Sequence, residues 1–366
     1  MIYMEDSFKN LPQKIRQNWE SLYLSRDIQE EWVKVCEEAV EDYTPFYYVK
    51  TSDDDSIEGL VVGNIIKKLD CLNFVKKEEA IKNILNQREE IPDYFRYDVL
   101  FIGGPMSMEA GIYYDENSCS TFEQFFDEFQ KYIFEYKSFD GIFFTNIDIN
   151  NHSVTSSNTI SIPYYPNTLL KLNFDDFNDY LKSLKKKKRW DIKNKKKIFK
   201  EAGCSIEIVS NSDINENYYD EFFQLYLNTE ENNPETMNYQ HYSKSNRFQN
   251  FKKLTDDYKW IIVKKEGEII AFALLVCNDD ILTFKHVGLD YSVNRQTFSY
   301  FNLFYRAIKF GIDNSFKEMY CGSTTYDVKT NLGCKLIERV AYISFNYMKT
   351  ENVSAISSLI DFDFGG

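Results

Sequence analysis

The chain has 366 residues, of which 43% are hydrophobic and 17% aromatic, and its formal net charge is −14. This length exceeds what one hydrophobic core usually supports, and the apolar content is typical of folded proteins, so we expect two globular domains rather than a disordered chain. The excess acid lies in the first 165 residues, and a net negative protein repels nucleic acid and anionic membranes at long range.

The sequence gives no sign of a signal peptide or a membrane span. The start, MIYMEDSFKN, has no basic stretch followed by an apolar one, and no uncharged apolar run approaches about 18 residues. The cysteines include no CxxC pair and make a poor disulfide framework. We therefore expect a cytoplasmic protein with reduced, buried thiols. The seven cysteines are Cys36, Cys71, Cys119, Cys204, Cys277, Cys321 and Cys334.

The first half alternates strands and helices. Residues 45–50 and 57–67 predict a hairpin, because two apolar runs flank an acidic turn. Residues 96–104 and 141–147 predict two buried strands on either side of a helix that begins at Thr121 and is rich in Phe and Tyr. A strand, a helix and a strand with connections this short pair in parallel, so the first half is expected to be α/β.

The second half begins after a polar, turn-rich stretch at 148–166, which predicts a crossover and a domain boundary near Pro166. Residues 175–203 predict one long helix that ends at Gly203, and residues 268–291 predict a hairpin that turns at 278–280. Further strands and helices are predicted at 205–210, 216–230, 239–254, 259–267, 297–316, 318–324 and 339–349.

Local sequences resemble one known family. KKKKRWDIKNKKKIFKEAGCSIEIV is similar to the basic helix that precedes the catalytic domain of Fem-like proteins, and EFFQLYLNT resembles their first helix. The most specific match has Ala and Gly on one helix, Gly at a strand end, then Lys and a Leu-Gly pair. Those residues are Ala307, Gly311, Gly322, Lys329, Leu332 and Gly333. The chain resembles a GNAT-superfamily acyltransferase of the Fem-like branch, with tandem GNAT-like halves.

The resemblance implies an α/β fold of two GNAT-like (acyl-CoA N-acyltransferase) domains, each a mixed, mostly antiparallel sheet flanked by helices. Residues 1–165 would be a degenerate copy and residues 166–366 the catalytic domain. The implied activity is N-acyl transfer, in which an amine directly attacks a thioester or ester donor, with no metal and no tightly bound cofactor. Two alternatives stay open: an aminoacyl-tRNA-dependent Fem-type peptide or amide ligase, and a non-catalytic GNAT-like binding module.

The implied donor is acyl-CoA, an acyl carrier protein or aminoacyl-tRNA, and the acceptor is a small-molecule amine, with no membrane partner. GNAT enzymes hold the donor pyrophosphate on a glycine-rich loop at a helix start. Here that position reads GLDYSVNRQTFSYFN, which has only one glycine, Gly288, and Arg295 and Gln296 would supply much of the contact. Because the glycine-rich loop is missing, donors other than acetyl-CoA stay open.

The segment 182–200 contains eleven basic residues and one acid, Asp191. Residues such as Arg189 would attract a phosphorylated donor, or the run is simply a solvated helix face. The apolar spacing of Trp190 with Ile192, Ile198 and Phe199 predicts that one side of this helix packs.

The resemblance also suggests catalytic residues. His286 stands where GNAT enzymes often place a general base, and an imidazole suits removing a proton from an amine, although a lone histidine is more often structural. Tyr326 follows the next strand, where many of them supply a tyrosine that protonates the departing thiolate. Asp327 is a candidate for orienting a substrate ammonium, and Lys329 for pairing with a carboxylate or phosphate. A helix-capping Asp and a surface Lys explain the last two equally well.

Other residues have simpler explanations. His152 and His241 are far from His286 in the sequence, and the three make no metal site by spacing. The Gly-Gly-Pro at 103–105 lacks the Lys-Ser/Thr of a phosphate loop, so we interpret it as a turn. Cys321 has no thiol-protease pattern around it and is interpreted as a buried thiol.

Overall fold

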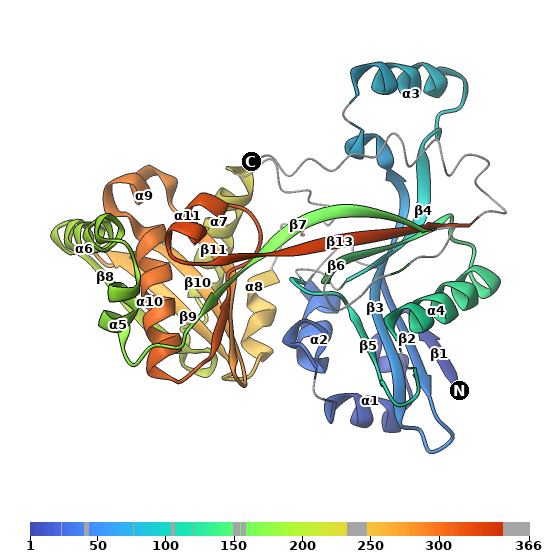
Figure 1. Ribbon diagram of the computed structural model, residues 1–366, viewed down its shortest axis with the longest axis horizontal. Coiled ribbons are helices and arrows are strands. Elements are labelled where there is room, and N and C mark those ends of the chain that lie inside the picture. The colour runs from blue at the N-terminus through green and yellow to red at the C-terminus, as the bar shows by residue number, and fades with distance from the viewer. Residues whose placement is uncertain are drawn as a thin grey trace. The chain divides into compact units, whose positions relative to one another are not determined.

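The computed structural model describes residues 1–22, 24–39, 44–75, 77–103, 107–119, 121–148, 154, 159–232 and 247–346. The chain, traced in Figure 1, divides into two compact units. The N-terminal unit contains residues 1–37, 43–165 and 338–366, and the C-terminal unit contains residues 38–42 and 166–337. Residues 338–366 thus group with the first unit. The assignment of residues 1–165 and 166–366 as separate domains stays a prediction.

The N-terminal unit is a mostly antiparallel sheet with helices on both faces. Its strands are β1 (Ile2–Glu5), β2 (Pro45–Thr51), β3 (Ile57–Asp70), β4 (Arg96–Ile102), β5 (Ile112–Tyr114), β6 (Gly141–Asp148) and β13 (Lys335–Phe345). Its helices are η1 (Phe8–Asn10), α1 (Gln13–Glu20), η2 (Arg26–Ile28), α2 (Glu30–Ala39), η3 (Cys71–Phe74), α3 (Glu78–Glu90) and α4 (Phe122–Tyr136). The strand order is β1-β2-β3-β4-β6-β13, with β5 beside β3.

Two expectations for this unit are confirmed. The predicted hairpin is the antiparallel pair β2 and β3. The predicted parallel pair is β4 and β6, and the connection between them contains β5 and α4 (Figure 1).

Alternation along β2 gives each face of this sheet its own core. Tyr48 contacts Phe129 of α4, with ring centroids 4.9 Å apart, whereas its neighbour Tyr47 contacts Trp19 of α1 at 5.8 Å. Successive side chains of a strand point to opposite faces, so a continuous apolar run in β2 serves two layers. The layer under α4 is rich in Phe and Tyr, and the layer under α1 contains Phe8, Trp19 and Tyr47.

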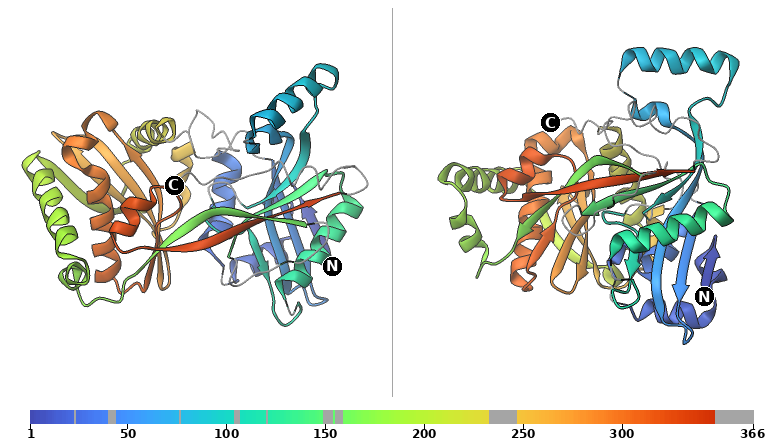
Figure 2. Two further views of the ribbon diagram at one scale, coloured as in Figure 1. Left: turned by 45° about the horizontal axis from the view of Figure 1, so that its top comes forward. Right: turned by 45° about the vertical axis from the view of Figure 1, so that its right-hand side comes forward.

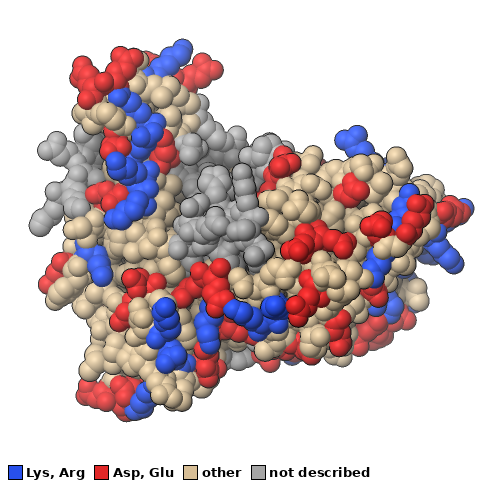
Figure 3. Space-filling view, turned by 180° about the vertical axis from the view of Figure 1, so that it is seen from behind, with Lys and Arg blue, Asp and Glu red and all other residues tan. Residues whose placement is uncertain are grey.

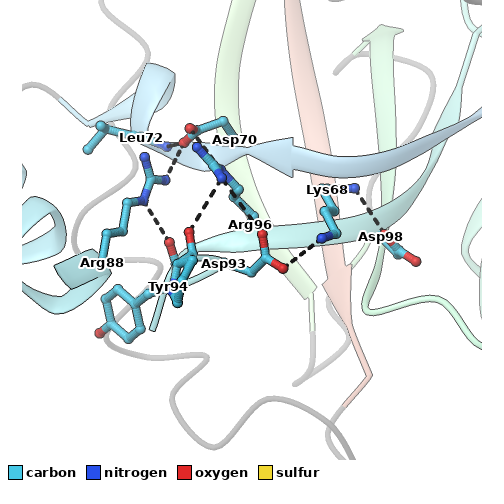
Figure 4. Close-up of polar contacts among 9 residues, drawn as sticks. Lys68, Asp70, Leu72, Arg88, Asp93, Tyr94, Arg96 and Asp98 are labelled. Atoms are coloured by element: carbon cyan, nitrogen blue, oxygen red, sulfur yellow. Dashed lines mark hydrogen bonds and ion pairs between the residues drawn. The ribbon is translucent and has the colours of Figure 1, made fainter. Parts of the chain in front are cut away.

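A network of charged residues joins α3 to the ends of β3 and β4 (Figure 4). Asp70 accepts hydrogen bonds from Arg88 at 2.6 Å, from Arg96 at 3.3 Å and from the Leu72 N–H at 3.0 Å, and Arg88 also donates to the Tyr94 carbonyl. Burial alone would raise the pKa of Asp70, but the bond from Arg88 and the others together lower it. Figure 3 shows Lys and Arg side chains gathered over this end of the unit, with Asp and Glu beside them.

The C-terminal unit contains the other strands of this mixed sheet, which lie between helices (Figure 2). Its strands are β7 (Thr159–Lys171), β8 (Cys204–Ser210), β9 (Tyr258–Lys265), β10 (Glu268–Asn278), β11 (Ile281–Leu289) and β12 (Glu318–Tyr320), in the order β7-β12-β11-β10-β9-β8. Its helices are α5 (Phe177–Ser183), α6 (Lys186–Glu201), η4 (Asn211–Asp213), α7 (Tyr218–Glu231), α8 (Arg247–Asn250), η5 (Phe251–Lys253), α9 (Tyr291–Thr297), α10 (Ser299–Asp313) and α11 (Tyr326–Asn331). Strand β7 begins in the N-terminal unit and continues into this one.

Neighbouring residues of β9 show the two layers. Trp260 stacks on Phe222 of α7, with centroids 4.7 Å apart, whereas Ile261 lies in the core that α5, α6 and α10 cover. The predicted hairpin of β10 and β11 is confirmed, and its turn places Asp279 at a φ of +45°. The expected α/β fold class, with mixed, mostly antiparallel strands flanked by helices, is confirmed, although the described strands of both units belong to one 13-stranded sheet rather than to two.

The predicted helix over 175–203 is wrong in one respect, because α5 and α6 are separate helices. The break lies at Leu184 and Lys185, where the backbone becomes extended. Arg189 donates from Nη1 to the carbonyls of Lys182 and Leu184, at 3.0 and 2.9 Å, and so satisfies carbonyl groups left by the end of α5. A hydrogen bond from a side chain to carbonyls five and seven residues earlier leaves no periodic signal in the sequence.

Other boundaries also differ from the predicted ones. The helix predicted at 297–316 is preceded by α9, and Phe298 between α9 and α10 is left-handed, with a φ of +53°. The strand predicted at 318–324 ends at Tyr320. Of the helix predicted at 239–254, residues 239–246 lie outside the described residues, and α8 and η5 occupy 247–253. No helix in the described ranges has the length and apolar content to cross a membrane.

Candidate functional site

Strands β11 and β12 pair over a short distance and then separate. Their parallel register joins only Ile281 to Glu318, Leu282 to Met319 and Thr283 to Tyr320. Beyond Thr283, β11 continues to Leu289, whereas the chain after β12 enters the turn 321–325. The carboxyl end of β11 therefore extends past its parallel neighbour, and the carboxyl ends of parallel strands are where α/β sheets commonly bind ligands.

A β-bulge in β11 sets which way His286 faces. The pairing with β10 joins Leu274 to His286 and Leu275 to Phe284, so the register skips Lys285. An extra residue on one strand reverses the alternation of side chains. Phe284 consequently stacks on Phe304 of α10, with centroids 4.2 Å apart, whereas His286 lies on the opposite face, towards α7.

His286 lies in an aromatic environment and is 8% exposed. The edge of the Tyr226 ring meets the imidazole at 5.6 Å, and the Phe251 ring is stacked parallel to it at 6.4 Å. The Tyr226 hydroxyl donates a hydrogen bond to the carboxylate of Glu230 on the same helix. The imidazole therefore has apolar walls and a tyrosine–carboxylate pair beside it.

The turn 321–325 is strained. Gly322, Thr324 and Thr325 have φ values of +74°, +66° and +45°, and β-branched residues rarely adopt this region. The Thr168 hydroxyl donates to the Gly322 carbonyl at 2.6 Å, and the hydroxyls of Tyr300 and Thr325 are 2.9 Å apart. Backbone strain of this kind persists only where surrounding contacts enforce it, and it is concentrated at functional sites.

Lys329 is buried beneath this turn and is 3% exposed. Its ammonium donates to the carbonyls of Gly322 and Ser323 at 3.2 and 2.7 Å. Burial lowers the pKa of Lys329 to about 8, while nearby Cys321 and Cys334 act in the opposite direction. The surface-lysine interpretation is therefore wrong, because this ammonium holds the turn from inside. Its predicted contact with the donor remains a prediction.

The other residues predicted on α11 differ in exposure. The Tyr326 hydroxyl donates to the Pro166 carbonyl of β7 at 3.0 Å. Asp327 is exposed in the first turn of α11, whose N-cap position is occupied by Thr325. A capping role for Asp327 is thus not observed, and its side chain faces solvent.

The predicted donor-binding residues lie on four elements, one of which is α11 with Lys329. Gly288 faces α7, and a Cβ added there would lie 2.2 Å from the Phe272 ring and 2.8 Å from Leu225. Glycine at this position allows α7 to approach β11 closely. Arg295 and Gln296 are exposed on α9, which occupies the position of the glycine-rich loop. Arg189 lies in the first turn of α6, and its Nη1 donates to two backbone carbonyls.

Helix α6 presents a stripe of exposed residues that we call the α6 stripe, formed by Lys186, Trp190, Lys193 and Lys197. Trp190 is 65% exposed, so the prediction that it packs is wrong, whereas Ile192 and Phe199 are buried. The inner face also contains Lys195, whose ammonium is 3.7 Å from the centroid of Phe301 and 2.5 Å from Asp191. Charge alone could not show that a lysine would pack and the tryptophan would not.

The structure places Tyr226 beside His286 and joins Tyr226 to Glu230 by a hydrogen bond, and sequence reasoning missed both Tyr226 and Glu230. Their spacing of four on one helix is the signal that would have paired them. His152, His241 and Gly104-Pro105 lie outside the described residues. Cys321 is buried, as predicted, whereas Cys204 and Cys277 are only partly buried. Within the described part of the chain, no three His, Cys, Asp or Glu side chains form a metal-binding group.

The chain matches the model of one protein family. The model of the FemAB-like family, described as peptidoglycan biosynthesis/recognition, matches residues 138–346, more than half of the chain. No curated protein matches. Among solved structures, FemX is similar over 92% of this chain and 96% of its own, with 10% identity and a TM-score of 0.56.

Two further structures have the same fold. The C-terminal domain of a putative lysylphosphatidylglycerol synthetase from Agrobacterium fabrum matches over 95% of both chains, with 11% identity and a TM-score of 0.54. L-PGS from Bacillus licheniformis matches over 93% of this chain and 99% of its own, with 11% identity and a TM-score of 0.52. The suspected resemblance is confirmed: the chain belongs to the FemAB-like family, with the tandem GNAT-like fold of Fem-like acyltransferases.

Proposed function

We propose that the C-terminal unit is a transferase that moves an aminoacyl or other acyl group from an ester or thioester donor to an amine. The supporting observation is the separation of β11 from β12, with His286 on the strand that extends further and a strained turn after the strand that ends. Beyond Thr283, backbone N–H groups of β11 would polarise the carbonyl group of the donor.

The transfer needs one bond made and one broken. The amine nitrogen attacks the donor carbonyl, the C–N bond forms, and the C–O or C–S bond breaks. His286 accepts the proton that the amine loses, and Tyr326 supplies a proton to the departing oxygen or sulfur. Asp327, exposed at the start of α11, would hold the ammonium form of the acceptor before attack.

Aminoacyl-tRNA is the donor that we propose first. The α6 stripe offers three exposed lysines around one exposed indole, and lysines neutralise phosphates while an aromatic ring stacks on a base. The name of one structural relative refers to an aminoacylated lipid, lysylphosphatidylglycerol. Acyl-CoA and acyl carrier protein are the alternative donors, and for these Arg189, Gly288, Arg295, Gln296 and Lys329 are the proposed contacts.

Binding experiments separate these donors. We expect the intact chain to bind charged tRNA with an affinity that falls steeply between about 50 and 200 mM salt. Replacing Lys186, Lys193 and Lys197 by Gln should reduce the salt slope by about 3, whereas replacing Lys171, Lys264 and Lys309, which lie on other elements, should not. Thermal stabilisation by CoA or acetyl-CoA without tRNA binding would favour a thioester donor. If the chain neither bound charged tRNA nor was stabilised by CoA or acetyl-CoA, the proposal would be contradicted.

A further inference from the structure

Two cysteines contact each other beneath the strained turn. The Sγ atoms of Cys321 and Cys334 are 3.8 Å apart, and the residues are 3% and 7% exposed. Cys321 directly follows β12 and Cys334 directly precedes β13. Each adjoins a glycine with positive φ, Gly322 at +74° and Gly333 at +95°. A bond between the two sulfurs would close a loop containing the turn 321–325 and all of α11.

Three titratable groups face the pair: Lys329 from α11, Tyr180 from α5 and Tyr300 from α10. The hydrogen bond shared with Cys334 and burial raise the pKa of the Cys321 thiol. The same hydrogen bond, helped by the Lys329 ammonium, lowers the pKa of the Cys334 thiol. Lys329 is the one cation among the three facing groups, so a thiolate at Cys334 is electrostatically favoured.

We propose that Cys321 and Cys334 are a dithiol that hydrogen peroxide oxidises reversibly to a disulfide, which locks the turn 321–325. The sulfur separation of 3.8 Å must shorten to about 2.05 Å for the bond to form, a change that the two flanking glycines can accommodate. Formation of the bridge is independent of the proposed transfer function, whereas its effect on transfer rests on that function.

The chemistry balances in two steps. The Cys334 thiolate attacks one oxygen of hydrogen peroxide, the S–O bond forms, the O–O bond breaks, and the departing hydroxide takes a proton to become water. The Cys321 sulfur then attacks the sulfenic sulfur of Cys334, the S–S bond forms, the S–O bond breaks, and the Cys321 proton leaves in a second water. Two thiols are oxidised, and one peroxide is reduced to two waters.

The turn is the part of the fold that the bridge would affect. Its contacts with Thr168 and with Tyr300 position it beside the end of β12, and Lys329 binds it from inside. Closing the sulfurs draws both ends of the 321–334 segment together, and these contacts must adjust. The oxidised form is therefore expected to have a less mobile turn and altered transfer.

Peptide mapping of the intact chain tests the bridge. The protein is treated with hydrogen peroxide, unfolded with N-ethylmaleimide, and digested without reductant. We expect the peptides that contain Cys321 and Cys334 to appear linked, two hydrogen masses lighter than their sum, and to separate after dithiothreitol. Cys71 and Cys119, which are also buried, are the controls and should be alkylated. Equal alkylation of Cys321, Cys334 and Cys71 after peroxide treatment would overturn the proposal.

A variant tests the order of attack. In Cys321→Ser the sulfenic acid on Cys334 has no partner thiol, so dimedone should label Cys334 after peroxide treatment. Absence of that label in a variant that melts like the wild type would overturn the assignment of Cys334 as the attacking thiol. Lys329→Met should form the bridge about tenfold more slowly than the wild type, because the thiolate loses its neighbouring cation. An unchanged rate would contradict that role of Lys329.

Discussion

The hydroxyl of Tyr326 donates a hydrogen bond to the carbonyl of Pro166, 3.0 Å away, and so ties α11 to β7. In the proposed reaction the same hydroxyl protonates the leaving group. We expect Tyr326→Phe to lower the free energy of unfolding by about 1 kcal/mol, as for one lost hydrogen bond, and to lower kcat by at least about tenfold. Urea denaturation and steady-state kinetics measure the two effects.

Tyr300→Phe is the matched control for this tyrosine. It removes a hydroxyl that contacts Thr325 in the same region, but no proton transfer is assigned to it. Its stability should fall by a similar amount, with kcat largely retained. If both variants kept kcat, Tyr326 would have a positioning role only.

His286→Gln tests the general base. The amide occupies a similar volume but does not accept the amine proton, so kcat should fall by about a hundredfold or more. Circular dichroism and thermal melting should show a folded protein, because the aromatic rings around the site are unchanged. Tyr226→Phe keeps the ring and removes the bond to Glu230, and we expect it to lower kcat less than His286→Gln. A transfer rate in His286→Gln equal to that of the wild type would exclude the assigned role.

Lys329 makes stability depend on pH. Burial lowers the pKa of Lys329 to about 8 in the folded chain, below its value of about 10.4 in an unfolded chain. Between these two values the unfolded chain binds a proton that the folded chain does not, so stability rises with pH in that window. From about pH 7 to about pH 10, the wild type should gain about 2 kcal/mol relative to Lys329→Met. Urea denaturation at several pH values measures this difference, and parallel curves for the two proteins would contradict it.

Gly288 and Gly311 provide a matched pair of substitutions. At Gly288 a new Cβ meets the Phe272 ring and the backbone of α7. Neither can shift without displacing the residues packed around it. At Gly311 it meets the terminal methyl group of Leu172, which can rotate away. We expect Gly288→Ala to cost about 2 to 3 kcal/mol of unfolding free energy and Gly311→Ala about 1 kcal/mol or less. Equal costs in thermal or urea unfolding would show that α7 adjusts more freely than its packing indicates.

Local periodicity was enough to predict most of the elements around the site. The hairpin of β10 and β11 follows from two apolar runs around 278–280, and the parallel pair β4 and β6 follows from the short connection through α4. The position of His286 on a strand was also predictable. Its orientation was not, because the bulge at Lys285 depends on how β11 pairs with β10, and pairing register is not visible in one strand alone.

Two predicted site residues are fixed by hydrogen bonds to backbone carbonyls five to seven residues earlier in the chain. Lys329 was predicted to face a ligand, but burial and the backbone carbonyls of a strained turn determine its environment. The break between α5 and α6 has a similar cause, since Arg189 binds carbonyls in the preceding segment. Trp190 has helical spacing with buried neighbours and yet is exposed, because the inner face of α6 is filled by Ile192, Phe199 and the stems of lysines.

A single-turnover assay tests the central claim most directly. The purified chain is mixed with aminoacyl-tRNA, or separately with acetyl-CoA, and with a set of small amines, and loss of donor is measured together with formation of an amide. The account predicts that the wild type forms an amide from at least one donor, and that His286→Gln forms it about a hundredfold more slowly. Donor loss no faster than in buffer, or equal rates for the two proteins, would contradict the account.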